Sequence, residues 1–323
     1  MVGRFLQTVL LAASARQAIA SCAYGTFLHP RAEEGGAVPI NTFGYTGSIG
    51  PLNWAQLEAA NDVCSTGTRQ SPIDMAPGAF NMVPASELAL EVPDFTEGTE
   101  FENLGTTIEV IAKGGTLSFS GKVFELQQFH FHLPSEHLDN GTSQAMEMHM
   151  VWQSAEQEIA VIGVYIEIAT EASAAAPPVV VERRGRFARP QQVAHQKRQN
   201  ETGAVVSAKA PTVLLETIFS VVDAIAAPGT KVETPPLIMS EVLDLIKAGG
   251  FQGYSGSLTT PPCSEGVHWL VSTAKLAVSP ATFLKVRDII GFNSRFPQNA
   301  LGQPNLLQVA AIAAAAVQAP IAK

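Results

Sequence analysis

The sequence is poor in charged residues and has no long apolar run. Asp, Glu, Lys and Arg make up 15% of its 323 residues, against 46% hydrophobic residues, which implies a sizeable buried core. The formal net charge is −9, which argues against nucleic acid or an anionic membrane surface as a partner. The apolar stretches near both termini are too short to cross a bilayer, so we expect no membrane span.

Cysteine is scarce as well, with three residues in the sequence. The position at which an N-terminal signal is cleaved decides how many of them the mature protein keeps. Residues 1–23 have the pattern of a secretory signal, in which Arg4 precedes an apolar run and small residues follow. Cleavage after Ala20 would leave Cys22 as an odd third cysteine, either free or paired between molecules. Cleavage after Ala23 would remove it and leave an even pair in an oxidising compartment. We favour the second cut and expect a secreted, extracellular protein.

Three of the seven histidines lie in one short stretch, Gln127–His137. Successive side chains on a strand point to opposite faces, so Gln128, His130 and His132 would share one face while the intervening phenylalanines share the other. The pattern predicts a polar wall backed by an aromatic core.

A second stretch, Met146–Met150, repeats this arrangement, with Glu147 and His149 on one face and methionines on the other. A lone histidine in an apolar strand is usually a core or surface residue, but the repeated pattern favours metal ligation. Three neutral imidazoles with an open fourth position are typical of catalytic zinc, whereas structural zinc uses four ligands, usually with cysteines. Gln128 and Glu147 could accept the other ring N–H of two of the histidines. Spacing alone does not name the metal.

Short runs broken by Gly and Lys predict hairpinned strands, and apolar residues at helical spacing predict helices farther along. The expected strands include Thr107–Ile111, Thr116–Phe119 and Ile159–Ile168, and the expected helices are Val213–Ala226, Ser240–Lys247 and Phe283–Ile290.

Residues 169–210 differ from the rest, because Ala and Pro runs there precede a basic patch with two dibasic pairs, Arg183-Arg184 and Lys197-Arg198. This composition is typical of a disordered insertion. Basic residues also suit nucleic-acid binding, but a solvated linker is their commoner role. The dibasic pairs would suit proteolytic processing, and read-through of an intron would give similar sequence; the sequence does not separate the two.

The motifs, taken in order, resemble those of the α-class carbonic anhydrases of secreted, eukaryotic-microbial type. The matching pieces are Gln128–His132, Ser135–His137, Glu147 with His149, Gly256–Pro262, Trp269, and Asn293 with Arg295. The resemblance covers residues 39–307, between a flexible lead-in (24–38) and an Ala-rich tail (308–323). It implies a mainly β (α+β) fold, a single domain around a large twisted, mostly antiparallel sheet with short peripheral helices.

The resemblance also implies a mechanism, in which His130, His132 and His149 bind Zn²⁺ and zinc-bound hydroxide attacks CO₂ to give bicarbonate and a proton. Gln128 and Glu147 would hold the histidines from behind. The hydroxyl of Thr259 would accept the hydrogen bond of the hydroxide and donate its own to Glu136. The residues that resemble the CO₂ pocket are Val151, Val161, Leu258, Thr260 and Trp269, with Tyr45 at the rim.

One position departs from the family's best-known pattern. Many members carry a histidine proton shuttle after an Asn-x-Gly run, whereas in this chain Asn103–Gly105 is followed by Thr106. A threonine does not titrate near neutrality, so we expect proton transfer to buffer to limit turnover.

Cys64 and Cys263 match positions at which secreted members form a disulfide, and Asn140 and Asn200 lie in glycosylation sequons. CO₂ and bicarbonate are the only partners that the resemblance implies, and the oligomeric state stays open.

Other readings compete with a carbonic anhydrase. A relative that has lost catalysis would be a secreted binding protein, although such relatives typically lose a zinc histidine. A cupin would use His130, His132 and Glu136 as ligands, but the region before His149 lacks the second cupin motif. Esterase activity would be a side reaction of the same site.

Overall fold

The computed structural model describes residues 26, 37–170 and 210–318. The predicted signal sequence, most of the lead-in and nearly all of the insertion, with its sequon at Asn200, lie outside the described residues.

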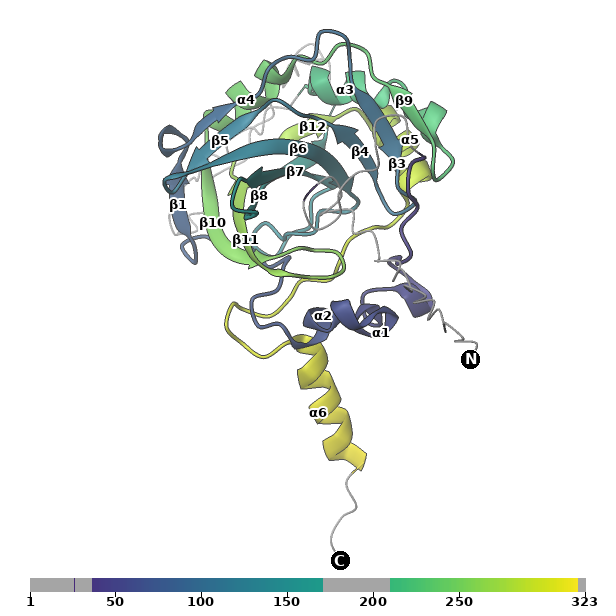
Figure 1. Ribbon diagram of the computed structural model, residues 1–323, viewed down its shortest axis with the longest axis vertical. Helices are drawn as coiled ribbons and strands as arrows, with labels where there is room; N and C mark the ends of the chain where they lie inside the picture. The colour runs from purple at the N-terminus through teal and green to yellow at the C-terminus, as the bar shows by residue number, and fades with distance from the viewer. Residues whose placement is uncertain (1–25, 27–36, 171–209, 319–323) are drawn as a thin grey trace, which may run out of the picture.

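A large twisted sheet forms the body of the molecule (Figure 1). Within the described residues it has 12 strands, and its main path runs β1-β10-β11-β8-β7-β6-β4-β3-β9, with β5 beside β6, β2 beside β5 and β12 beside β8. Among these strands the parallel pairs are β8 with β11 and β8 with β12, and all other pairs are antiparallel. This confirms the expected fold class. The strands are β1 Asn81–Pro84, β2 Ala89–Glu91, β3 Glu100–Asn103, β4 Ile108–Ile111, β5 Thr116–Phe119, β6 Lys122–His132, β7 Met146–Ser154, β8 Ile159–Ile168, β9 Lys231–Glu233, β10 Gly250–Ser257, β11 Glu265–Ser272 and β12 Leu276–Val278.

A bulge in β6 decides which face its histidines occupy. The register against β7 shifts between Leu126 and Gln128. Before the bulge Phe124 and Leu126 enter the core, and after it Phe129 and Phe131 do. Because one extra residue reverses the alternation, the polar side chains after the bulge all face away from that core.

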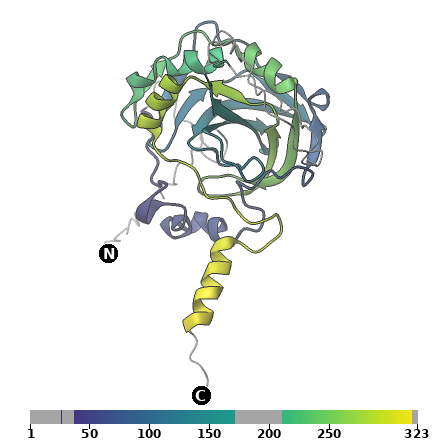
Figure 2. The same ribbon diagram turned by 180° about the vertical axis from the view of Figure 1, so that it is seen from behind.

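The helices α3 (Val213–Phe219), α4 (Met239–Lys247) and α5 (Pro280–Ile290) gather on one side of the sheet (Figures 1 and 2). Their apolar side chains join the same core as the phenylalanines of β6. The helix expected over Val213–Ala226 is interrupted, since α3 ends at Phe219 and a 3₁₀ turn follows at Val222–Ile225. Two short helices, α1 (Trp54–Leu57) and α2 (Val63–Thr66), precede the sheet.

The Ala-rich tail forms a helix, α6 (Leu306–Gln318), which projects away from the body (Figures 1 and 2). Neither it nor any other helix in the described part of the chain has the length and hydropathy that a membrane crossing requires.

A disulfide joins Cys64 of α2 to Cys263, 199 residues later, with a Cα–Cα distance of 5.0 Å. Both backbone carbonyls are held as well: Gln70 Nε2 donates to the carbonyl of Cys263 at 3.0 Å and Arg295 Nη2 to that of Cys64 at 3.2 Å. The bridge thereby anchors the loop after β10, which carries Thr259.

Candidate metal centre

The predicted ligands His130, His132 and His149 converge on one point. His130 on β6 lies directly opposite His149 on β7, and His132 follows on the same face two residues later. One nitrogen of each ring lies within 4.8 Å of the others, and all three side chains are fully buried.

Two of the imidazoles are oriented by the side chains that the sequence predicted. His130 Nδ1 donates to Gln128 Oε1 at 2.8 Å, and His149 Nε2 donates to Glu147 Oε1 at 2.9 Å. A neutral imidazole has one N–H and one lone pair, so these bonds assign the lone pairs to Nε2 of His130 and Nδ1 of His149. This is the arrangement in which a metal-binding histidine is held from behind.

The third imidazole is oriented by a group that sequence reasoning missed. His132 Nδ1 donates to the backbone carbonyl of Asn293 at 2.9 Å, while the Asn293 amide donates to the carbonyls of Thr106 and Phe131. Every residue has a backbone carbonyl, so the sequence does not show which one accepts this hydrogen bond. Asn293 was noted only as part of the matching motifs.

These lone pairs fit a metal ion. Among the described residues, His132 Nε2 and His149 Nδ1 are buried without a hydrogen-bond partner. A buried lone pair without a partner costs roughly 1–3 kcal/mol, which a bound cation would remove. Three imidazoles with no thiolate match a zinc site with an open position.

The environment keeps the imidazoles neutral. Burial, together with the neighbouring rings of His132 and His149, holds the pKa of His130 well below its usual range. Burial and His149 lower the pKa of His132 to about 3, and burial also lowers the pKa of His149. Since only neutral imidazole binds a metal, the donors are ready near neutral pH.

A second group, His137, Glu147 and His149, is also close enough to hold a metal ion. However, both nitrogens of His137 are engaged, Nδ1 with Glu147 Oε1 at 2.7 Å and Nε2 with the Tyr254 hydroxyl at 2.7 Å. The two imidazoles hold the pKa of the Glu147 carboxyl well below its usual range, despite the opposing effect of burial. This group is therefore a hydrogen-bonded support for the metal centre.

Thr259 and Glu136 meet beside the histidines. Glu136 Oε2 lies 3.5 Å from His132 Nε2, and Glu136 Oε1 accepts the backbone N–H of Arg295 at 2.8 Å. Burial raises the pKa of Glu136 well above its ordinary value, while hydrogen bonds from Thr259 and from the Arg295 backbone oppose this shift. The structure thus brings the predicted pair into one hydrogen-bonded unit.

The predicted apolar wall forms a cluster next to the ligands. Val151, Val161, Leu258 and Trp269 pack together there, and the rings of Trp269 and His149 are 4.8 Å apart. Thr260 is fully buried in the same loop as Thr259.

The remaining predicted residues lie in other parts of the fold, although Tyr45 lines a hollow of about 590 Å³ together with Glu136. Tyr45 packs edge-on against Phe43 and Trp54, in the cluster that contains the disulfide. Thr106 is almost fully buried, and its hydroxyl accepts from the Asn41 amide. Asn140 is exposed in the turn between β6 and β7.

Sequence reasoning also missed two buried acids on the same face. Glu109 on β4 lies directly opposite His130, and Glu102 on β3 lies opposite Glu109. The register of the strands places them beside the centre, and the sequence does not show this register. Their alternation with the apolar residues Phe101 and Val110 could have indicated that each carboxylate faces the side of the sheet opposite to the core.

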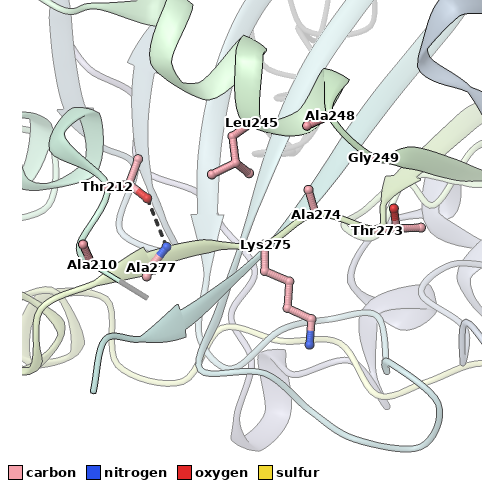
Figure 3. A pocket seen from close by; sticks show the side chains of 9 residues that line it. All are labelled: Ala210, Thr212, Leu245, Ala248, Gly249, Thr273, Ala274, Lys275 and Ala277. Carbon is pink, nitrogen blue, oxygen red and sulfur yellow. Dashed lines mark hydrogen bonds between the residues drawn. The ribbon is translucent and has the colours of Figure 1, made fainter. Parts of the chain in front are cut away.

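A separate hollow of about 470 Å³ contains no histidine (Figure 3). Lys275 extends from its lining and binds Asp139 and Glu167 at 2.7 and 3.0 Å, and the Thr212 hydroxyl accepts the backbone N–H of Ala277. The hollow is lined by Ala210, Thr212, Leu245, Ala248, Gly249, Thr273, Ala274, Lys275 and Ala277.

Comparisons with known proteins identify the family of the chain. Residues 49–305 match the family model of eukaryotic-type carbonic anhydrases. A carbonic anhydrase of Nostoc sp. is 30% identical over 260 residues, 80% of either chain, and one of Pectobacterium atrosepticum is 30% identical over 71% of this chain and 75% of its own.

Solved structures with a similar fold include carbonic anhydrases as well. The α carbonic anhydrase of Aspergillus oryzae is 36% identical, with a TM-score of 0.69 over 84% of this chain and 99% of its own. That of Thermovibrio ammonificans, in complex with the inhibitor sulfanilamide, is 29% identical, with a TM-score of 0.63 over the same shares. With its fold and three converging imidazoles, the chain belongs to the eukaryotic-type, or α, carbonic anhydrase family and is an enzyme of that family.

Proposed function

We propose that this protein catalyses the reversible hydration of CO₂ to bicarbonate and a proton at the centre formed by His130, His132 and His149. The observation that carries the proposal is the convergence of three buried, neutral imidazoles beside the Thr259 and Glu136 pair and an apolar wall.

His130, His132 and His149 would hold a zinc ion, which would supply Lewis acidity; in carbonic anhydrases this lowers the pKa of water to about 7 and provides a nucleophile at neutral pH. Gln128, Glu147 and the Asn293 carbonyl hold the imidazoles in the tautomers that present lone pairs.

Thr259 orients the reacting oxygen. Its hydroxyl proton is committed to Glu136, so Thr259 Oγ1 is left only as an acceptor for the proton of the attacking oxygen. That bond turns a lone pair of the oxygen toward the substrate carbon, an orientation effect. For this purpose the side chain of Glu136 must accept the Thr259 proton as a carboxylate. The hydrogen bond that the backbone N–H of Arg295 donates to Glu136 Oε1 stabilises the carboxylate.

The apolar wall serves the substrate. CO₂ is uncharged and apolar, so Val151, Val161, Leu258 and Trp269 suit it better than a polar surface would. Thr106 offers no titrating group, so the released proton reaches solvent through buffer.

The secretory features belong to the same proposal. The buried disulfide is compatible with an oxidising compartment, and the exposed turn at Asn140 is an accessible glycan site. We infer a secreted, glycosylated lyase.

Stopped-flow CO₂ hydration by the purified mature protein tests the proposal, with zinc content measured on the same sample and imidazole buffer varied. We expect about one zinc per chain and a rate that climbs with buffer concentration. Bound zinc without hydration would refute catalysis and favour a binding protein of this fold. Hydration that does not respond to buffer would refute proton transfer to buffer as the limiting step.

A further inference from the structure

A hollow of about 590 Å³ lies beside the metal centre and has no part in the proposed reaction. The described residues that line it include Glu136, but none of the ligand histidines, Thr259 or the apolar wall. They come from three separate segments of the chain, residues 45–52, 134–143 and 292–297. Sites for small molecules typically have volumes of roughly 300–1,000 Å³, so the hollow has the size of such a site.

The lining of this hollow is mostly apolar and aromatic. Tyr45, Phe292 and Phe296 supply rings, while Leu52 and three prolines supply aliphatic surface. Leu52 and Phe292 are 65% and 57% exposed, so water covers apolar side chains here. An occupant that displaces this water gains hydrophobic free energy, and an aromatic occupant also packs favourably against the rings.

The charged groups of the lining have partners inside the protein. Glu136 Oε1 accepts the backbone N–H of Arg295, and Glu136 Oε2 lies 3.5 Å from His132 Nε2. The guanidinium of Arg295 donates to the backbone carbonyls of Cys64 and Ser71. A charged ligand would therefore lose hydration in the hollow without gaining a counter-charge. The lining favours an uncharged occupant.

A buried hydroxyl gives the hollow a polar feature. Ser294 lines it, is 6% exposed and donates its hydroxyl proton to the backbone carbonyl of Pro134. A hydroxyl has one proton and two lone pairs, so Ser294 Oγ offers a ligand an acceptor. An aromatic molecule with an N–H or O–H group suits it better than one with acceptors alone.

The wall that contains Ser294 also supports the metal centre. Ser294 lies between Asn293 and Arg295 in the chain. The Asn293 carbonyl accepts the ring N–H of His132 at 2.9 Å. The Arg295 backbone N–H donates to Glu136 at 2.8 Å. An occupant that orders this wall would thus order the groups that hold a metal-binding imidazole and Glu136.

We propose that this hollow is a second binding site, for a small, uncharged aromatic molecule with a hydrogen-bond donor, and that its occupancy is linked to metal binding at the histidines. The rings of the lining take the aromatic part of the ligand, and Ser294 accepts its N–H or O–H. With a metal bound, His132 is fixed and, through the Asn293 carbonyl, so is the wall, which then binds the ligand more tightly. The linkage rests on the proposed metal centre, whereas the site itself does not.

Calorimetric titration of the mature protein with indole, an uncharged aromatic molecule with one N–H, tests the site without measuring turnover. We expect a Kd of about 0.1–1 mM for the zinc-loaded protein, as for a well-placed ligand of about ten heavy atoms. N-methylindole lacks the donor and should bind about fivefold more weakly. The metal-free protein should bind indole about threefold more weakly than the zinc-loaded protein, because its wall is less ordered.

Substitutions at the exposed part of the lining locate the bound indole. Phe292→Ser and Leu52→Ser remove apolar contacts and should each weaken indole binding about five- to tenfold. Leu284→Ser is the matched control, because Leu284 is a 45% exposed leucine of α5 that does not line the hollow. Its Kd should stay within about twofold of the wild-type value.

The absence of indole binding, or a wild-type Kd in both Phe292→Ser and Leu52→Ser, would overturn the site. Equal Kd values for indole and N-methylindole would overturn the assigned class of ligand, and equal values with and without zinc would overturn the linkage. Sedimentation of the same samples checks for self-association, whose loss in Leu52→Ser would assign the hollow to a second copy of the chain. Wild-type protein that binds indole and no zinc would support the site and refute the proposed function.

Discussion

Glu147 Oε1 lies 2.9 Å from Nε2 of His149, and this contact decides which nitrogen of the imidazole faces the metal centre. The other oxygen of Glu147 accepts the backbone N–H groups of Glu136 and His137 at 2.8 and 2.9 Å. One carboxylate therefore fixes a ligand, its neighbour His137 and the segment that carries Glu136.

Removing the charge of that carboxylate should weaken metal binding. We expect Glu147→Gln to lower zinc affinity by about 10- to 100-fold, because its amide supports the imidazole less well and does not satisfy all the donors around it. Zinc competition with a chromophoric chelator measures this. Glu158→Gln is the control, since it removes a partly exposed carboxylate far along β7–β8 from the ligands, whose ion pair in the described chain is with Lys122. Equal affinities in the two variants would show that Glu147 does not support the ligand.

The Thr259 hydroxyl should matter for rate and not for metal content. Thr259→Ala is expected to keep its zinc and lose about two orders of magnitude in kcat/KM, the usual effect of removing one orienting hydrogen bond in a water-excluded site. Thr259→Ser retains the hydroxyl and should keep most of the activity. If the alanine variant hydrates CO₂ as fast as the parent, the orienting role is wrong.

An imidazole introduced at position 106 should remove part of the limit that proton transfer sets on turnover. Thr106→His is expected to raise turnover at low buffer concentration, because an imidazole titrates near neutrality. The Thr106 side chain contacts Asn41, so the double variant with Asn41→Ser gives the imidazole room. Stopped-flow rates against buffer concentration measure the effect. No gain in either variant would count against a proton-transfer limit.

The Lys275 ion pairs should produce a stability difference that disappears at alkaline pH. Burial lowers the pKa of Lys275, but its bonds to Asp139 and Glu167 outweigh burial and raise the pKa above its ordinary 10.5. A raised lysine pKa stabilises the fold below about pH 10.5 and loses this effect as pH rises through the folded-state pKa.

We therefore expect Lys275→Met to reduce the free energy of unfolding by about 0.5–1 kcal/mol near pH 8, since the pairs are partly exposed. The difference should shrink above pH 11. Urea unfolding at both pH values measures it, with Lys122→Met at an exposed pair as the control. A difference that is constant with pH would assign the effect to packing.

Sequence patterns predicted the parts of the site that depend on alternation. Gln128, His130 and His132 share a face because they follow the bulge in β6 together, and Glu147 and His149 do so within one strand. The assignment of Thr259 and Glu136 came from resemblance, since residues so far apart show no local pattern. The Asn293 carbonyl was out of reach because every residue has one.

The fold was predictable in class and less so in detail. The turn residues on either side predicted β5 to the residue, while the order of the strands depends on contacts between distant segments. Glu109 was missed for that reason, because its opposition to His130 exists only in the register of β4 against β6. The break after Phe219 was missed because the apolar spacing continues through it.

The strand β12 holds both flanks of residues 171–209. Ala169 donates its N–H to the carbonyl of Val278, and Thr212 donates to that of Ala277, each at 2.8 Å. The chain therefore leaves the sheet and rejoins it at neighbouring residues of one strand. For protein engineering this makes residues 171–209 a site for insertion: we expect that the segment between the flanks can be shortened or replaced by a tag or a guest domain while the strands that carry the histidines keep their register.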